Sequence, residues 1–208
     1  MMRLAEEIMQ KLHGGNIWEG YAREPESQFV GGWNGTHKQL ILSKPTLAVD
    51  LGVYLGQSTI FIASDMKHRK VDGCVIAMDT FLGSPEIMGH IPNFEYGRPT
   101  LYEFFLSNVK QAGLTDYVVP FPIDSVSGAE ILLRKKIFPD FVHIDAAHDY
   151  NSVTQDTIRF WKILRSGGTM VGDDYDWPNV NSAANAFADK VGLKLTIDLP
   201  KWVLRKPR

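Results

Sequence analysis

The chain has 208 residues, of which 44% are hydrophobic and 22% are charged. This ordinary globular composition excludes a disordered chain or a fibrous repeat and allows one large domain. The 22 lysines and arginines nearly balance the 24 aspartates and glutamates, so a net charge of −2 gives no overall attraction to nucleic acid or an anionic membrane. We therefore expect a small molecule as the partner, and the sequence is equally compatible with a homo-oligomer.

The cellular location is inferred from cysteine usage and from the N-terminus. The single cysteine, Cys74, excludes an internal disulfide framework and a cysteine-rich zinc site. The first residues carry acids where a signal peptide needs an apolar core, and no apolar run approaches the roughly 18 residues of a membrane span. We expect a soluble, cytoplasmic protein.

The N-terminal segment is expected to hold one helix. Leucine and isoleucine at intervals of four over residues 2–12 predict an amphipathic helix that ends at Gly14. An irregular lead-in with an aromatic anchor at Trp33 follows. We divide the chain into this helix and lead-in, residues 1–31, and a single globular domain, residues 32–208.

Beyond this lead-in, short apolar runs alternate with segments of helical length. Five strand–helix pairs in succession predict an α/β, doubly wound, mostly parallel sheet of the Rossmann-like kind. Two further β-rich runs, broken at Leu199 and Pro200, predict a C-terminal antiparallel hairpin and a total of seven strands. The five pairs are residues 46–51 with 57–67, 74–79 with 101–113, 117–123 with 127–136, 140–145 with 151–164, and 169–174 with 179–192.

One connection is too long for a simple crossover. Residues 80–99 separate the second strand from its helix, and a loop of this size in a compact domain is usually functional. We interpret it as a lid. Its apolar and aromatic side chains would either close over a site or pack on one another; they are Met88, His90, Phe94 and Tyr96.

The first two strands end in residues suited to a nucleoside. Ligands of open parallel sheets bind outside the carboxyl ends of the strands. The first strand runs through Asp50 into a turn with Gly52 and Gly56, whose glycines let the backbone approach a ligand. Such a turn can also be a mere connector. Asp79 ends the second strand, close to the spacing of roughly 20 residues at which such folds place an acid against ribose hydroxyls.

The third and fourth strands end in further polar residues. Asp124 and Ser125 follow the third strand, where they would either contact a ligand base or cap the next helix. Asp145 ends the fourth strand, and His148 follows in the same loop. An imidazole with a pKa near 6.5 can take a proton from an acceptor hydroxyl, although a lone loop histidine can also be only a hydrogen-bonding partner. His143, inside the strand, is expected to be structural.

Two more acids follow the neighbouring fifth strand. Asp173 and Asp174 would join Asp145, and three crowded carboxylates raise one another's pKa or require a cation. Oxygen ligands favour Mg²⁺, Mn²⁺ or Ca²⁺. The alternative is that Asp174 or Asp176 caps the following helix while Asp173 bonds loop amides.

These segments together resemble the class I S-adenosylmethionine-dependent methyltransferases, and in particular a branch of small members related to antibiotic-sugar O-methyltransferases. The resemblance runs from about Gly32 to the C-terminus. The segments that carry it are VDLGVYLGQST, AMDTFLGSPE, PFPIDSVSGAE, HIDAAHDY, RSGGTMVGDDYDWPNV and KWVLRK.

The resemblance implies S-adenosylmethionine as cofactor and assigns roles to the strand ends. It places Gly52 and Gly56 under the methionine part, Asp79 at the ribose hydroxyls, and Asp124 with Ser125 near the adenine. Some relatives bind a divalent ion at acids in these places, here Asp145, Asp173 and Asp174. Where those relatives carry a further acid two residues beyond the first, this chain has Ala147, which leaves His148 and Asp145 as the candidate catalytic residues. Asp50, Ser58, Thr80 and Asp145 complete the expected cofactor-binding set.

We expect O-methylation of a small molecule, against four alternatives. A nicotinamide-dependent oxidoreductase should show three glycines where positions 52, 54 and 57 are Gly, Tyr and Gln. A hydroxylase-like enzyme and a non-catalytic adenosylhomocysteine-binding protein would share the same fold. A nucleic-acid or protein methyltransferase would need a basic face, whereas the C-terminal basic residues are expected to form a solvated strand edge; they are Lys201, Arg205, Lys206 and Arg208.

Overall fold

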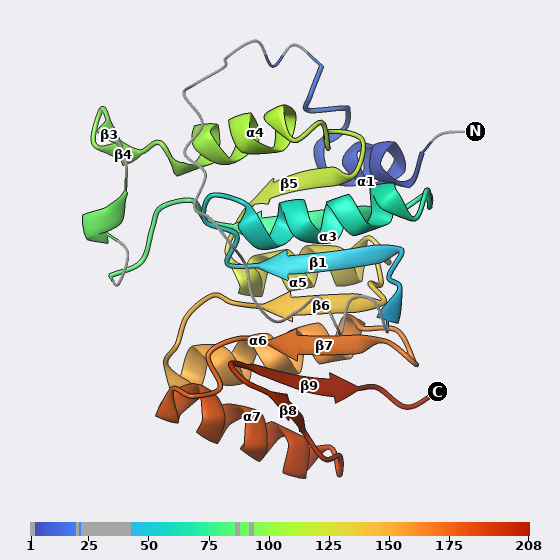
Figure 1. Cartoon of the computed structure of the whole chain (residues 1–208), viewed down its shortest axis with the longest axis vertical. Coiled ribbons are helices and arrows are strands. Elements are labelled where there is room, and N and C mark those ends of the chain that lie inside the picture. The colour runs from blue at the N-terminus through green and yellow to red at the C-terminus, as the bar shows by residue number, and fades with distance from the viewer. Residues whose placement is uncertain (1–2, 20, 22–42, 86–87, 92–93) are drawn as a thin grey trace.

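A seven-stranded sheet runs through the computed structural model, which describes residues 3–19, 21, 43–85, 88–91 and 94–208 (Figure 1). The expected anchor Trp33 and the domain boundary after residue 31 lie outside the described residues. The strand order is β5-β2-β1-β6-β7-β9-β8, with β9 antiparallel to both of its neighbours, β7 and β8, as the predicted terminal hairpin requires. The strands are β1 (Leu47–Leu51), β2 (Cys74–Asp79), β5 (Val118–Pro122), β6 (Phe141–Ile144), β7 (Thr169–Gly172), β8 (Thr196–Asp198) and β9 (Lys201–Arg205).

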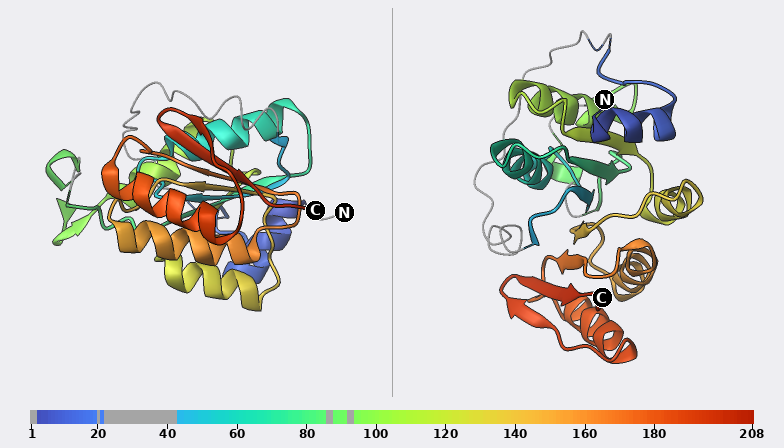
Figure 2. Two further views of the ribbon diagram at one scale, coloured as in Figure 1. Left: turned by 90° about the horizontal axis from the view of Figure 1, so that it is seen from below. Right: turned by 90° about the vertical axis from the view of Figure 1, so that its right-hand side faces the viewer.

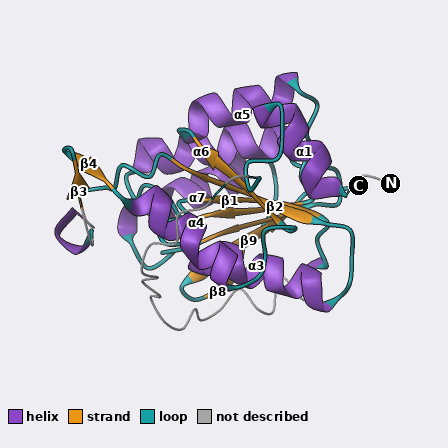
Figure 3. Cartoon of the chain, turned by 90° about the horizontal axis from the view of Figure 1, so that it is seen from above, coloured by secondary structure: helices purple, strands orange, loops and turns teal. Residues whose placement is uncertain are grey.

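Helices cover both faces of this sheet. In Figures 2 and 3, α1, α5, α6 and α7 lie on one face, and α3 and α4 lie on the other. No helix in the described part of the chain has both the length and the apolar character that crossing a membrane requires. The helices are α1 (Leu4–His13), α3 (Gln57–His68), α4 (Leu101–Gln111), α5 (Ser125–Arg134), α6 (Tyr150–Ile163) and α7 (Pro178–Lys190).

The central strands are apolar almost throughout because both of their faces are covered. All residues of β1, β6 and β7 are buried, which explains why these strands read as nearly continuous apolar runs without alternation. Two hydrophobic cores result. One lies under α1, α5, α6 and α7, and the other lies under α3 and α4.

The order of the strands fixes the position of the site. The chain builds the sheet outward from β1, first through β2 to β5 and then through β6 to β7, so the winding direction changes between β1 and β6. In open α/β sheets the ligand crevice lies at this change, outside the carboxyl ends of the strands. The loops that follow β1, β2, β5 and β6 therefore meet at one edge.

Helix α1 protects the edge strand β5. It ends at Gly14, whose φ of 79° is the left-handed conformation of a helix stop, as the sequence predicted. Ile8 is 3% exposed and belongs to the same core as α5 and α6. At the end of α1, Nε2 of His13 lies 2.8 Å from the Pro120 carbonyl oxygen. After the helix, Nε1 of Trp18 donates a hydrogen bond to the Val118 carbonyl. Two carbonyl groups on the outer edge of β5 therefore have hydrogen-bond partners.

The connection interpreted from the sequence as a lid has secondary structure of its own. It contains a short 3₁₀ helix, Met88–His90, and a two-stranded hairpin of β3 (Phe94–Glu95) and β4 (Arg98–Pro99) that stands away from the sheet (Figure 1). Tyr96 at its tip is 97% exposed, and Phe94 is half exposed. At this exposure, Tyr96 neither covers the site nor packs on a neighbouring side chain.

Candidate functional site

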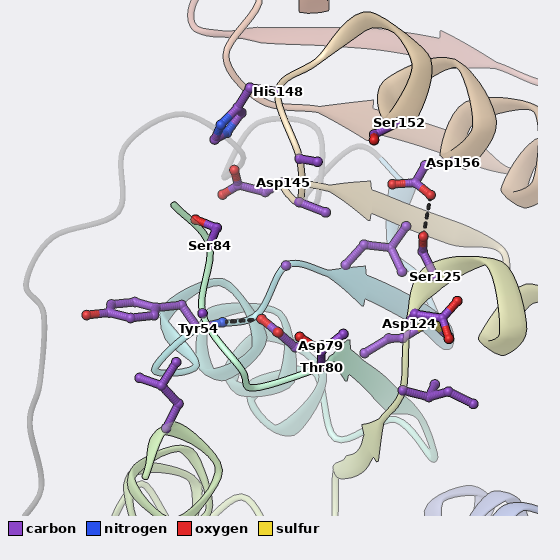
Figure 4. Close-up of a pocket in the computed structure, with 18 residues that line it drawn as sticks. Tyr54, Asp79, Thr80, Ser84, Asp124, Ser125, Asp145, His148, Ser152 and Asp156 are labelled. Atoms are coloured by element: carbon purple, nitrogen blue, oxygen red, sulfur yellow. Dashed lines mark hydrogen bonds between the residues drawn. The ribbon is translucent and has the colours of Figure 1, made fainter. Parts of the chain in front are cut away.

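A cavity of about 420 Å³ opens at the carboxyl ends of β1, β2, β5 and β6 (Figure 4). Backbone turns, two helix N-termini and the start of the long 80–99 connection form its wall. It brings together most of the side chains that the sequence singled out. The polar side chains and glycines that line it include Gly52, Tyr54, Asp79, Thr80, Ser84, Asp124, Ser125, Asp145, His148, Ser152 and Asp156.

Asp79 is held at the end of β2 by two backbone amides. Its Oδ2 accepts a hydrogen bond of 2.9 Å from the Tyr54 amide, and its Oδ1 accepts one of 2.8 Å from the Phe81 amide. Each carboxylate oxygen has two acceptor sites, so both oxygens can still accept a hydroxyl from the pocket. The carboxylate is therefore held in one orientation and can still accept hydrogen bonds from a ligand.

The turn after β1 packs directly on the loop after β6. Gly52 has a φ of +78°, and a Cβ there would lie 1.7 Å from the carbonyl oxygen of Asp145. Only glycine satisfies both conditions. Gly56, with a φ of 96°, is the N-cap of α3 and does not itself line the cavity, although it was expected to bind the cofactor.

Asp50 and Ser58 do not line the cavity, although both were expected to bind the cofactor. Asp50 is 0% exposed within β1. Its Oδ2 accepts hydrogen bonds from the hydroxyls of Ser58 and Thr59, at 2.7 and 2.5 Å, and its Oδ1 lies 2.8 Å from Nδ1 of His143. These residues satisfy one another beneath the pocket, because a buried carboxylate needs hydrogen-bond partners.

Asp124 and Ser125 have separate roles at the start of α5. Asp124 is the helix N-cap and accepts a hydrogen bond of 2.8 Å from the Ser127 amide, and such hydrogen bonds lower the pKa of its carboxyl group. Ser125 instead donates a hydrogen bond of 2.5 Å to Asp156 on α6. Burial raises the pKa of Asp156 to about 6. Both side chains of this pair face the pocket (Figure 4).

His148 is oriented by a carboxylate and an indole. Its Nε2 lies 2.8 Å from Oδ2 of Asp174, and its ring lies 4.7 Å from that of Trp177. The expectation that Asp174 or Asp176 caps α7 is wrong. Trp177 occupies the N-cap position without a side-chain hydrogen bond, and Pro178 opens the helix.

The three expected metal-binding acids do not form one group. Strands β6 and β7 are neighbours, as predicted, but the Asp145 carboxylate lies in two overlapping clusters. One cluster contains His143 and Asp173, and the other contains His148 and Asp174, with all ligand atoms of a cluster within 4.8 Å of one another. Burial raises the pKa of Asp145, while the charges of His143 and then Lys201 lower it.

Lys201 corrects the expectation of a solvated basic edge. Its side chain is 0% exposed, and its Nζ contacts Oδ2 of Asp173. Strand β9 runs antiparallel to β7 with Gly172 opposite Trp202, which sets Lys201 beside the acids that follow β7. Burial lowers the pKa of Lys201 to about 8, against the opposing effects of Asp145 and Asp50.

The other basic residues of the C-terminus differ in their exposure. Lys206 donates hydrogen bonds of 2.7 Å to the carbonyls of Trp161 and Leu164, so it ties the chain end to α6. Arg205 and Arg208 are exposed. The basic residues of β9 and the chain end therefore do not act together as one solvated face.

Several residues in or beside the pocket were missed by the sequence reasoning. Asp156 and Ser152 belong to a polar helix and Trp177 to a loop, and neither pattern distinguishes them from ordinary surface residues. Lys201 could have been found. The predicted terminal hairpin makes the last strand antiparallel to its neighbour, so its first residue must lie beside the acidic end of that neighbour.

Comparisons with known proteins identify a family and solved structures with the same fold. A family model described as a methyltransferase domain matches residues 49–175. The structure of an O-methyltransferase from Bacillus cereus in complex with SAH is 17% identical, with a TM-score of 0.62, and the match covers 98% of this chain and 90% of that one.

Two other solved structures share the fold at similar identity. The O-methyltransferase NovP is 19% identical, with a TM-score of 0.60 and coverage of 82% and 76% of the two chains. TomG from Streptomyces achromogenes, an O-methyltransferase involved in tomaymycin synthesis and solved with SAM, is 15% identical, with a TM-score of 0.57 and coverage of 82% and 77%. No curated protein sequence matches the chain.

Proposed function

The chain belongs to the methyltransferase-domain family, and from that membership we propose that it transfers a methyl group from S-adenosylmethionine to an oxygen atom of a small molecule. The observation that carries the proposal is the cavity that joins Asp79 at the end of β2 to Asp145 and His148 at the end of β6. One wall suits a nucleoside, and the opposite wall carries acid–base groups.

The residues present fit the methyl donor. Asp79 would accept hydrogen bonds from the ribose hydroxyls, and the turn from Gly52 to Gly56 would face the methionine part. Asp124 and Ser125 at the start of α5 would lie near the adenine. Asp50 and Ser58 would act from below by holding the first strand and its helix together. When bound, the donor supplies a methyl group on a positively charged sulfur, which is an excellent leaving group.

Methyl transfer then asks two things of the protein. It must align acceptor and methyl group while excluding water, and it must remove the proton of an acceptor hydroxyl. The contact between Nε2 of His148 and Asp174 favours the tautomer with hydrogen on Nε2, which leaves Nδ1, a buried atom, as the acceptor nitrogen. We propose His148 as the base, with Asp174 and Trp177 as the groups that orient it.

A divalent cation is a second candidate for easing proton removal. The ligand atoms of Asp145, His148 and Asp174 lie within 4.8 Å of one another. Two carboxylates with one imidazole suit Mn²⁺ better than Mg²⁺, which prefers oxygen ligands. The contact of Lys201 with Asp173 opposes the full three-acid site that the sequence predicted. Chelation separates the candidates: a metal-dependent enzyme loses turnover in EDTA and regains it with Mg²⁺ or Mn²⁺, whereas an enzyme that depends on His148 alone does not respond.

The experiment that tests the proposed function follows formation of S-adenosylhomocysteine by mass spectrometry. The purified protein is incubated with S-adenosylmethionine and a panel of small phenols and sugars. His148→Ala should lower the rate by roughly 10²- to 10⁴-fold if the imidazole is a general base. Tyr150→Ala, a half-exposed neighbour at the start of α6, serves as the matched control. Binding of NADH in place of S-adenosylmethionine would contradict the proposal.

A further inference from the structure

A buried group of charged side chains lies below the acceptor end of the pocket, and Lys201 is part of it. Its Nζ contacts Asp173 and lies 3.4 Å from Nε2 of His143. The ligand atoms of His143, Asp145 and Asp173 all lie within 4.8 Å of one another. The far side of His143 is held by Asp50, which is itself completely buried. Three carboxylates therefore surround one lysine and one imidazole.

This arrangement has the donors of a metal site but already contains a cation. Buried carboxylates need a positive charge within reach, because leaving them unpaired in a poorly solvated place is strongly unfavourable. A divalent ion would meet that need by coordination. The ammonium of Lys201 meets it with one charge and three N–H donors, and it uses a carboxylate oxygen of Asp173 that an ion would need.

The strand register makes this placement a built-in feature of the fold. The pairing of Gly172 with Trp202 aligns the start of β9 with the end of β7, so Lys201 meets Asp173 as a direct consequence of the sheet. Trp202 is 0% exposed and packs against Gly172, where a Cβ would lie 2.0 Å from the indole. The close packing of this pair fixes the position from which the lysine reaches the acids.

We propose that the ammonium of Lys201 takes the place of a divalent cation at Asp145 and Asp173, so that the acceptor side of the pocket holds a cation that the protein itself supplies. Asp173 is then an ion-pair partner and not a metal ligand. This inference deepens the proposed function and rests on it only in placing the acceptor beside Asp145.

The test compares two truncations of the same lysine. Lys201→Ala removes the charge and opens space, whereas Lys201→Met removes the charge but keeps most of the volume. With MnCl₂ as the probe, the Tm values of wild type and Asp173→Asn are expected to respond alike, because Asp173 holds no ion in wild type. The Tm of Lys201→Ala should rise by about 5–10 °C at a Mn²⁺ concentration roughly 100 times its Kd. Lys201→Met should not respond, and Lys201→Ala with Asp173→Asn should lose the response.

Two results would overturn the inference. One is a Mn²⁺-dependent rise in the Tm of wild type that disappears in Asp173→Asn. The other is a Lys201→Ala variant that responds to Mn²⁺ no more than Lys201→Met does. If Lys201→Ala does not fold alone, refolding it with and without Mn²⁺ replaces the melting experiment, because the ion should rescue this variant and not Lys201→Met.

The same samples separate this inference from the proposed function. Calorimetric titration with S-adenosylmethionine reports on the cofactor wall, which lies on β1, β2 and β5 and does not include Lys201. A protein that gains a metal site in Lys201→Ala but never binds S-adenosylmethionine would support the inference and contradict the proposed function. A protein that binds S-adenosylmethionine but gains no metal site in Lys201→Ala would support the proposed function and contradict the inference.

Discussion

Asp79 and Asp156 line the same pocket, but their carboxyl groups are stabilised in different ways. Asp79 accepts two backbone amides, whereas Asp156 is 4% exposed and has a hydroxyl of Ser125 as its partner. Asp79 was predictable, because it ends an apolar strand at a ribose-binding spacing. Asp156 was not, because an acid on a polar helix face gives no sign that the helix turns that residue inward.

Replacement of Asp79 should weaken binding of the methyl donor. A charge-assisted hydrogen bond is worth about 1.5–3 kcal/mol, so Asp79→Ala should lower the affinity for S-adenosylmethionine by roughly 10- to 150-fold. Calorimetric titration measures this change. Asp189→Ala, which removes an exposed acid on α7 outside this pocket, is the control. Unchanged affinity in a folded Asp79→Ala variant would remove Asp79 from the cofactor site.

Asp156 should make the stability of the protein fall as pH rises. Its pKa is raised from 3.8 to about 6 in the folded state, so the folded protein binds the proton more tightly than the unfolded chain. The free energy of unfolding should therefore decrease by about 3 kcal/mol as pH rises from about 4 to above about 6. Asp156→Asn should remove this slope, as measured by urea unfolding at several pH values.

Asp149 provides a control of opposite sign for that experiment. It caps α6, and hydrogen bonds from Ser152 and from the Asn151 amide lower the pKa of its carboxyl group. Its contribution to stability is therefore present at neutral pH and lost as pH falls through the folded pKa. If Asp156→Asn and Asp149→Asn changed the pH slope in the same direction, the assignment of the raised pKa to Asp156 would be wrong.

At the scale of elements, the turn between β1 and α3 is the most constrained part of the site. Its backbone approaches the loop after β6 so closely that the two loops form one wall of the pocket. The glycine pattern predicted a close backbone approach. It could not show that the backbone approached is that of Asp145, since this contact depends on the parallel pairing of β1 with β6.

Gly52→Ala should therefore be far more damaging than a glycine replacement elsewhere with the same backbone conformation. Gly97, in the exposed hairpin, has a φ of +76°, and a Cβ there would meet no atom of the described residues within 4 Å. Gly97→Ala should cost at most about 1–2 kcal/mol, the usual cost of a left-handed residue. Gly52→Ala adds a clash with backbone and should abolish folding or lower the free energy of unfolding by more than about 3 kcal/mol. Urea unfolding of both variants decides the matter.

The long connection between β2 and α4 was predicted by its length but not by its shape. Gly83 and Ser84 line the pocket, whereas the tip of the β3–β4 hairpin is exposed. Sequence length alone indicates that a loop does something beyond connecting two elements. It does not say which of its side chains face inward, because that depends on contacts with residues distant in the chain.

For the molecule as a whole, the order of strands and helices followed from the sequence because each central strand is a short, mostly apolar run. Burial of such runs on both faces is typical of parallel sheets, so few other folds were compatible with the sequence. The electrostatics below the pocket did not follow as directly. They depend on the antiparallel register of β9, which places Lys201 among acids from β1 and from the ends of β6 and β7.

The division of the chain at residue 31 can be tested through α1. Ile8 and Met9 are 3% and 1% exposed, and they pack in the core shared with α5, α6 and α7. If α1 is an integral part of the domain, Ile8→Ala should lower the free energy of unfolding of the entire protein by about 2–5 kcal/mol, because it leaves a cavity in that core. The whole unfolding transition in urea should then move to lower concentration in one step.

The exposed neighbour Gln10 is the control for this experiment. Gln10→Ala keeps helix propensity and buries nothing, so it should change stability by less than about 0.5 kcal/mol. A separate N-terminal unit would behave differently. Ile8→Ala would then produce a small unfolding transition at low urea and leave the main transition unchanged. The reason is that the lost side chain would not contribute to the stability of the sheet. A single displaced transition, seen both by tryptophan fluorescence and by circular dichroism, would show that α1 and the sheet unfold together and that the chain forms one cooperative domain.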